Sequence, residues 1–171
     1  QQRIEGRAVS LLFVRDAAAL TPIAWSEQWT APAPDTPYRW GGAAGPIAVA
    51  APGFEAKLAS LTGALGVRGL ASADCLDDGE TLWLLEINAR PGATLDMFDD
   101  ADDPLLARHI ASVTDRPAAP VKPRAPAATE IVYAERAIAL PAADWPDWAA
   151  DRSPAGTAFP AGAPVCTVGA R

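Results

Sequence analysis

The stretch LWLLEINARPG, residues 82–92, decides how this chain is interpreted. Apolar residues lead into Glu86, Asn88 and Arg90, which are spaced two apart and stand just before a Pro-Gly break. Side chains two positions apart on a β-strand lie on the same face. The pattern therefore predicts a strand with an acid, an amide and a guanidinium in a row on one face. The opposite, buried face is expected to consist of Trp83, Leu85, Ile87 and Ala89.

A second predicted strand, residues 70–76, precedes this one across the acidic turn 77–80, which contains the hairpin-forming pair Asp-Gly. Asp74 on that strand is the candidate for a further acid. Opposed residues of an antiparallel pair share a face, so Asp74 and Glu86 meet only if the turn holds an odd number of residues or the hairpin contains a β-bulge. Carboxylate and amide oxygens suit a hard cation such as Mg²⁺, and a guanidinium suits phosphate or carboxylate.

A plainer interpretation of the same pattern is a solvent-facing strand. Glu86 and Arg90 would then form a surface ion pair, which contributes under roughly 1 kcal/mol to stability. The alternation by itself favours this interpretation over a metal and nucleotide site.

Composition excludes several classes of protein. The formal net charge is −7, half of the 171 residues are hydrophobic and 20% are charged, which is typical of a globular protein and argues against a nucleic-acid partner. No apolar run approaches the roughly 20 residues of a membrane-spanning helix, so no membrane partner is expected. Cys75 and Cys166 lack metal-ligand spacing and are predicted to be free, buried thiols in a reducing compartment, by default the cytoplasm.

The remaining pattern predicts an α+β fold with a mostly antiparallel sheet and flanking helices. The chain begins without Met and inside a strand-like run, so we interpret it as a piece of a longer protein. Composition divides it into a main subdomain at 1–115, a Pro/Ala-rich connector at 116–127 and a small β-rich appendage at 128–171. The expected elements are strands at 4–14 and 20–30, a Pro/Gly-rich loop at 31–46, a helix at 53–65, and a helix at 103–113 that begins at Asp103 as N-cap.

Some residues outside the central hairpin leave two interpretations open. Trp25, Trp29 and Trp40 are expected to pack in the core or anchor the loop, with stacking on a substrate as the alternative. Gly41 and Gly42 suit either a close approach of the backbone to a ligand or a plain turn. The acid-rich run 99–103 is expected to be a solvated helix cap rather than a metal cluster.

The central motif, Asp followed after eleven residues by Glu-Ile-Asn-x-Arg, resembles the signature of the ATP-grasp superfamily. The resemblance implies that Asp74, Glu86 and Asn88 hold Mg²⁺, with Mn²⁺ as an alternative ion, against the phosphates of ATP. It also implies that Arg90 contacts the transferring phosphoryl group or an acyl phosphate. The fold expected from it for residues 1–115 is the C-terminal subdomain of an ATP-grasp enzyme, from the hinge onward.

The opening residues QQRIEG resemble the hinge of that superfamily, where backbone and an apolar side chain contact adenine. The resemblance would place Gln2, Arg3 and Ile4 against the base. The superfamily's phosphate-binding lysines and glycine-rich lid precede the hinge, and Lys57 and Lys122 fit neither role. The chain by itself is therefore expected to be inactive.

The activity implied by the resemblance is that of an Mg-ATP-dependent carboxylate–amine ligase. Its partners would be a small-molecule carboxylate and a small-molecule amine, and a homodimer is compatible with it. The alternatives are a non-catalytic ATP-grasp-like scaffold or nucleotide-sensing module, and phosphotransfer without ligation. A fainter similarity is to the ATP-grasp proteins that accompany tetrahydromethanopterin or methylofuran metabolism.

Overall fold

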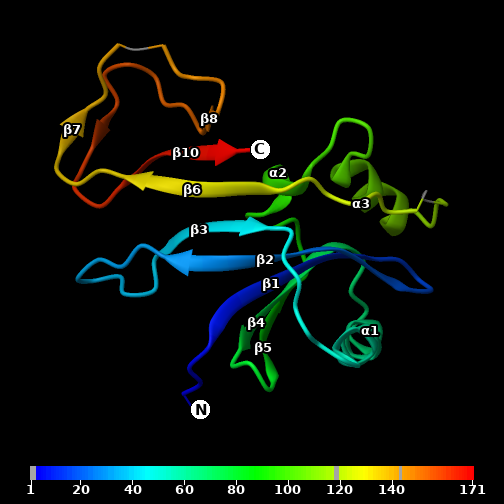
Figure 1. Ribbon diagram of the computed structural model, residues 1–171. Helices are drawn as coiled ribbons and strands as arrows, with labels where there is room; N and C mark the ends of the chain where they lie inside the picture. Colours follow the sequence, from blue (N-terminus) through cyan, green and yellow to red (C-terminus); the bar gives the residue numbers. More distant parts are fainter. Residues whose placement is uncertain (1–2, 118–119, 143) are drawn as a thin grey trace.

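The computed structural model describes residues 3–117, 120–142 and 144–171. Within them an eight-stranded antiparallel sheet has the order β5-β4-β1-β2-β3-β6-β10-β8, and β7 and β9 form a separate two-stranded sheet (Figure 1). The α+β fold class predicted from the sequence is confirmed. The elements are β1 (Arg7–Arg15), β2 (Leu20–Thr30), β3 (Trp40–Gly45), α1 (Phe54–Ala64), β4 (Gly69–Asp77), β5 (Leu82–Asn88), α2 (Leu95–Phe98), α3 (Leu105–Val113), β6 (Ala127–Tyr133), β7 (Ile138–Ala139), β8 (Ala149–Ala150), β9 (Ala158–Phe159) and β10 (Pro164–Ala170).

One face of the sheet packs against α1. Alternate residues of β1, such as Leu11 and Phe13, point to this face and are fully buried. Leu58 of α1 belongs to the same cluster, and the rings of Trp25 and Phe54 lie 5.7 Å apart between β2 and α1. Trp25 is thus a core residue, as the packing interpretation predicted.

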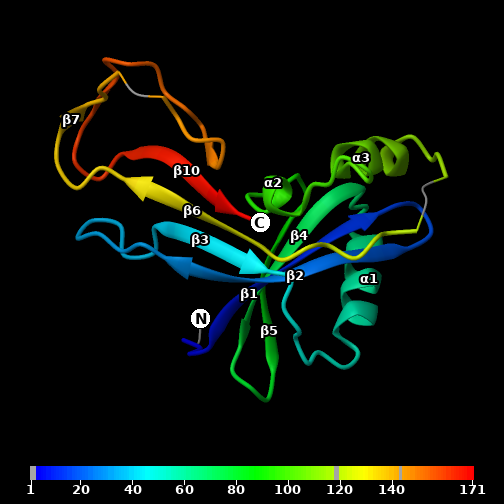
Figure 2. The ribbon, with the colours of Figure 1, turned by 45° about the horizontal axis from the view of Figure 1, so that its top comes forward.

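The other face packs against α2 and α3, which lie across the sheet from α1 (Figure 2). Leu12 of β1 and Leu70 of β4 are buried there with Phe98 of α2 and Leu105 of α3. Only part of this face is apolar. Farther along β1, β2 and β4 it becomes polar, and that is where the candidate site lies.

The prediction that residues 31–46 form a loop is wrong for their last part. β3 pairs with β2 on one side and with β6 on the other. A Cβ atom at Gly42 would overlap the Thr129 carbonyl oxygen and the Trp29 indole ring. The glycine therefore serves a close packing of strands, and neither a turn nor a ligand accounts for it.

Asp103 is not the N-cap of the last helix. α3 begins after Pro104, and the Asp99 carboxylate accepts the hydrogen bond from the Leu105 amide. Asp103 is buried instead, with its two carboxylate oxygens 2.6 Å from Arg108 Nε and 2.8 Å from Arg124 Nη2. The expectation of a solvated cap at 99–103 is wrong for this residue, because two guanidinium groups neutralise it inside the protein.

Residues 128–171 continue the main sheet. β6 pairs with β3 and with β10, and β10 pairs with β8. The predicted division of the chain into a main subdomain, a connector and an appendage stays a prediction. The pairing of β3 with β6 joins residues 128–171 to the strands that precede the connector. Of the helices in the described segments, none has the length and apolar character needed to cross a membrane.

Candidate functional site

The central hairpin brings Asp74 and Glu86 directly opposite each other. In the β4–β5 register, Asp74 pairs with Glu86 whereas Cys75 pairs with Leu84, so Leu85 is the extra residue of a β-bulge. The geometric condition set by the sequence is met, and the two carboxylates share a face of the sheet. Asn88, opposite Ser72, lies on the same face.

The amide of Asn88 ties the two acids together. Its Nδ2 donates to Asp74 Oδ2 at 3.0 Å and to Glu86 Oε1 at 2.9 Å. The bulge reverses the facing of the residues before it, so Trp83, opposite Leu76, lies on the same face as Asp74. Trp83 and Leu85 are 39% and 50% exposed. The expectation that these two side chains are buried is wrong. Ile87 and Leu82 instead pack against the core beneath α1.

A row of hydroxyl groups extends the site across the sheet. Ser10 of β1 lies opposite both Asp74 and Ser26 of β2, and its Oγ donates to Asp74 Oδ1 at 2.6 Å. Ser26 Oγ donates to the Ser10 carbonyl oxygen at 3.4 Å. Ser10 and Ser26 are buried, and no motif in the sequence marks either of them as part of a site.

Burial raises the pKa of Asp74 above its ordinary value. The hydrogen bond from Ser10 lowers the pKa of Asp74, and the negative charge of Glu86 raises it further. Two carboxylates at opposed positions therefore repel each other, which a cation between them would relieve.

The donor set fits a divalent cation with a preference for oxygen. Asp74 and Glu86 offer carboxylate oxygens. In the structure Asn88 directs its Nδ2 at both acids, and rotation of this amide would bring its carbonyl oxygen to the same place as the third donor. In the described part of the chain, no three His, Cys, Asp or Glu side chains come together. An ion here would need further oxygen ligands, and Mg²⁺ commonly takes them from water and substrate phosphates.

Arg90 follows the hairpin at the edge of the site. It is exposed, and its Nη1 donates to the Pro91 carbonyl oxygen at 3.1 Å. Its positive charge lowers the pKa of Asp74, although by less than burial raises it. The guanidinium is thus within electrostatic reach of the carboxylates and open to solvent.

The residues expected at the adenine lie at the start of the chain. Gln2 lies outside the described residues. Arg3 is exposed and pairs with Glu5 at 3.7 Å, and Ile4 is half-buried ahead of β1. Lys57 lies on α1, on the opposite face of the sheet from Asp74.

The cysteines do not take part in the site. Both are free and buried, as predicted. Burial and, to a lesser degree, the charge of Asp74 raise the pKa of the Cys75 thiol to about 12. Cys75 points to the α1 face, away from the acids, and is not a nucleophile at neutral pH.

Solved structures with the same architecture exist. N5-carboxyaminoimidazole ribonucleotide synthetase from Thermus thermophilus matches 99% of this chain and 47% of its own, with 18% identity and a TM-score of 0.67. The chain has the fold of an ATP-grasp subdomain. Neither the protein-family models nor the curated proteins give a match to the sequence.

Two further neighbours contain ligands. N5-carboxyaminoimidazole synthase from Aspergillus clavatus, in complex with ADP and 5-aminoimidazole ribonucleotide, matches 95% of this chain and 46% of its own at 13% identity and TM-score 0.62. The biotin carboxylase domain of 2-oxoglutarate carboxylase from Hydrogenobacter thermophilus, in complex with the magnesium salt of ADP and with bicarbonate, matches 95% and 41% at 10% identity and TM-score 0.62. The chain therefore spans about half the length of these enzymes.

Proposed function

We propose that the protein containing this chain is an Mg-ATP-dependent ligase that joins a small-molecule carboxylate to a small-molecule amine. The observation that carries the proposal is the pairing of Asp74 with Glu86 across a bulged hairpin, with Asn88 bonded to both. The shared fold with enzymes solved in complex with ADP, its magnesium salt and bicarbonate supports it. A cytoplasmic location is part of the proposal, since both cysteines are free thiols, as is usual in a reducing compartment.

In the proposed site, Asp74, Glu86 and Asn88 would hold Mg²⁺ or, as an alternative, Mn²⁺. The ion would supply positive charge beside the phosphates of ATP. Arg90 would neutralise charge on the transferring phosphoryl group, and Arg3 and Ile4, with Gln2, would contact the adenine. Positioning and charge neutralisation are the main means by which proteins accelerate phosphoryl transfer.

The proposed reaction has two steps. A carboxylate oxygen of the acid attacks the γ-phosphorus of ATP, and the bond from that phosphorus to the β,γ-bridging oxygen breaks. The products of this step are an acyl phosphate and ADP. The amine nitrogen then attacks the acyl carbon, inorganic phosphate departs, and the nitrogen loses a proton to complete the amide. Buried Ser10 keeps the Asp74 carboxylate oriented throughout, through its 2.6 Å hydrogen bond.

Calorimetric titration of MgADP into the full-length protein, beside a Glu86→Gln variant, tests the proposal. We expect binding that requires Mg²⁺ and weakens at least tenfold in the variant. Glu55→Gln, an exposed change on α1 across the sheet, is the matched control and should bind as the wild type does. Folded wild type that binds no MgADP would contradict the proposal.

A turnover assay separates the ligase from its alternatives. Release of ADP that needs both an acid and an amine supports ligation, whereas ADP release without an amine indicates phosphotransfer. Nucleotide binding with no release under any condition favours a scaffold or sensing module. The subgroup associated with tetrahydromethanopterin or methylofuran is a further prediction, which a screen of pterin and furan acids and amines would address.

A further inference from the structure

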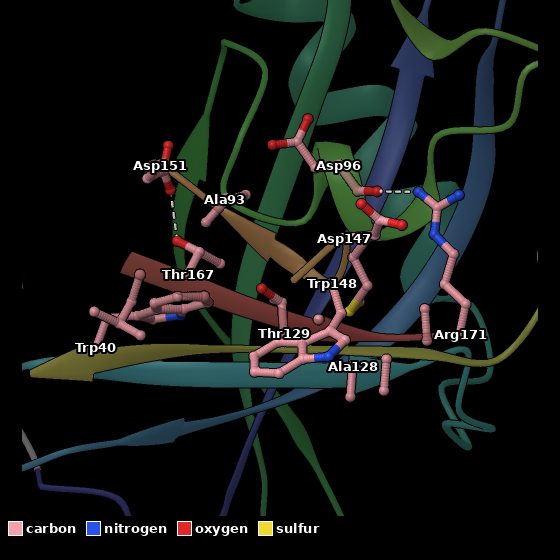
Figure 3. Close-up of a pocket in the computed structure, with 16 residues that line it drawn as sticks. Trp40, Ala93, Asp96, Ala128, Thr129, Asp147, Trp148, Asp151, Thr167 and Arg171 are labelled. Carbon is pink, nitrogen blue, oxygen red and sulfur yellow. Dashed lines mark hydrogen bonds between the residues drawn. The ribbon is translucent and has the colours of Figure 1, made fainter. Parts of the chain in front are cut away.

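A cavity of about 620 Å³ lies on the same face of the sheet as the acidic pair. Its floor is formed by β6 and β10, and α2 lies beside it (Figure 3). A line of paired residues crosses the sheet from the acidic pair toward the cavity. Gln28, two residues beyond Ser26, lies opposite Ala43, and Ala43 lies opposite Thr129, which lines the cavity. Volumes of this size are typical of small-molecule sites.

The charge of the lining is strongly negative. Asp96, Asp147 and Asp151 contribute three carboxylates, whereas Arg171 is the one basic residue of the described lining. Arg171 uses its Nη2 to donate to the Asp96 backbone oxygen at 2.9 Å. The lining therefore favours a cation over an anion.

Two indole rings complete the cavity. Trp40 and Trp148 line it, and in the view of Figure 3 the three carboxylates lie above them. Trp148 is 60% exposed, so its ring is open to a ligand. An indole face attracts ammonium and guanidinium groups. Aromatic faces together with carboxylates favour an organic cation over a bare metal ion.

The cavity is also close to the hairpin. Ala93, on its rim, follows Arg90 by three residues, and three Cα–Cα steps span about 11 Å at most. The rim of the cavity at Ala93 therefore lies within about 11 Å of Arg90, measured between Cα atoms.

We propose that this cavity binds an organic ammonium ion. On the proposed function, on which this step rests, that ion is the protonated form of the amine partner, which gives up one proton to solvent before its nitrogen attacks the acyl carbon. A ribonucleotide, such as that in the Aspergillus clavatus complex, carries a phosphate that the three carboxylates would repel. The chemistry of the cavity thus points to an amine without phosphate groups.

The test uses benzylammonium as the probe, with benzyl alcohol and benzyl phosphate as matched neutral and anionic compounds. Binding to the full-length protein is followed by NMR, through the indole N–H signals. Benzylammonium should bind at least tenfold more tightly than either comparison compound and should shift the signal that Trp148→Leu removes. Equal affinities for benzylammonium and benzyl alcohol would overturn the proposal.

Two substitutions in the lining of the cavity test whether benzylammonium binds there. Asp147→Asn and Trp148→Leu change exposed side chains, and each should weaken benzylammonium about threefold to fivefold, the range of exposed charge and cation–π contacts. Asp35→Asn, an exposed change in the loop before β3, is the control and should have no effect. Unchanged affinity in both cavity variants would contradict the assignment.

The two proposals fail separately. Benzylammonium binding that persists in Glu86→Gln, in a protein that binds no MgADP, would uphold the cation site and overturn its role as the amine site of a ligase. MgADP binding without benzylammonium binding would overturn the cation site and leave the proposed function in place.

Discussion

Asp74 and Glu86 occupy opposed positions of the β4–β5 ladder although the register changes one residue later, between Asp74 and Cys75. Leu85 absorbs the change as the extra residue of a bulge. Without it, one of the acids would point to the α1 face, because a shift by one residue reverses the facing of a strand. The bulge thus decides whether the two carboxylates form a site.

Ser10→Ala should destabilise the protein by about 1.5–3 kcal/mol, the range for a hydrogen bond to a charged group. The change removes the 2.6 Å donor from a partly buried carboxylate and raises the pKa of Asp74 further. Urea unfolding at pH 7.5 measures the loss of stability. Ser26→Ala, which removes only a 3.4 Å bond in the same row, is the comparison and should cost less. Equal losses in the two variants would contradict a special role for Ser10.

Magnesium should stabilise the protein more at pH 7.5 than at pH 5. The raised pKa of Asp74 means that the folded state binds a proton more readily than the unfolded chain, so ionisation of Asp74 weakens the fold above that pKa. A cation bound to the ionised form offsets this cost and competes with the proton. At ten times its dissociation constant, Mg²⁺ would add about 1.4 kcal/mol, which raises Tm by about 3–6 °C.

Thermal unfolding with and without Mg²⁺ at the two pH values provides the measurement. Asp74→Asn should abolish the magnesium effect while the variant remains folded. A Tm increase that is the same in the variant and in the wild type would place the ion elsewhere.

The hairpin could be predicted from the sequence because its information is local. A two-residue period and an Asp-Gly turn predict that Glu86 and Asn88 share a face, whereas the bulge at Leu85 breaks this period for the residues before it. Ser10 could not be predicted as a partner of Asp74, because the pairing of β1 with β4 joins segments 64 residues apart. No local pattern reports such a pairing.

The errors have similar causes. Residues 31–46 were predicted as a loop from their proline and glycine content, but Gly41 and Gly42 provide space for the Trp29 ring beneath β3. Asp103 stands where an N-cap is usual, yet two arginines, one of them 21 residues away, draw it into the interior. In each case a tertiary contact outweighs the local preference.

Asp103→Asn should cost about 3–5 kcal/mol, since it removes the carboxylate charge that both buried guanidinium groups, those of Arg108 and Arg124, contact. Burial would raise the pKa of Asp103, but the hydrogen bond from Arg108 and the charges of both arginines hold it below the ordinary value of 3.8. Its stabilisation is therefore complete above pH 3.8 and is lost as the pH falls through the lower, folded-state pKa.

Urea unfolding at pH 7 and a pH series of unfolding measure both effects. Asp102→Asn, one residue away and exposed, is the control and should change stability by less than about 0.5 kcal/mol. If Asp103→Asn were as stable as Asp102→Asn, the ion pairs of Asp103 with Arg108 and Arg124 would contribute little to stability.

Gly42→Ala should destabilise the protein by about 1–3 kcal/mol, the usual cost of overpacking. The added methyl group would overlap the Thr129 carbonyl oxygen at the pairing of β3 with β6, the pairing that joins residues 128–171 to the rest of the sheet. Gly169→Ala is the matched control, since a Cβ there lies 3.6 Å from the Ala128 carbonyl oxygen, an ordinary contact. Hydrogen exchange should show faster exchange of the β6 and β10 amides in Gly42→Ala and no change in the amides of β1 and β4. Faster exchange throughout the sheet would indicate that the two parts unfold as one unit.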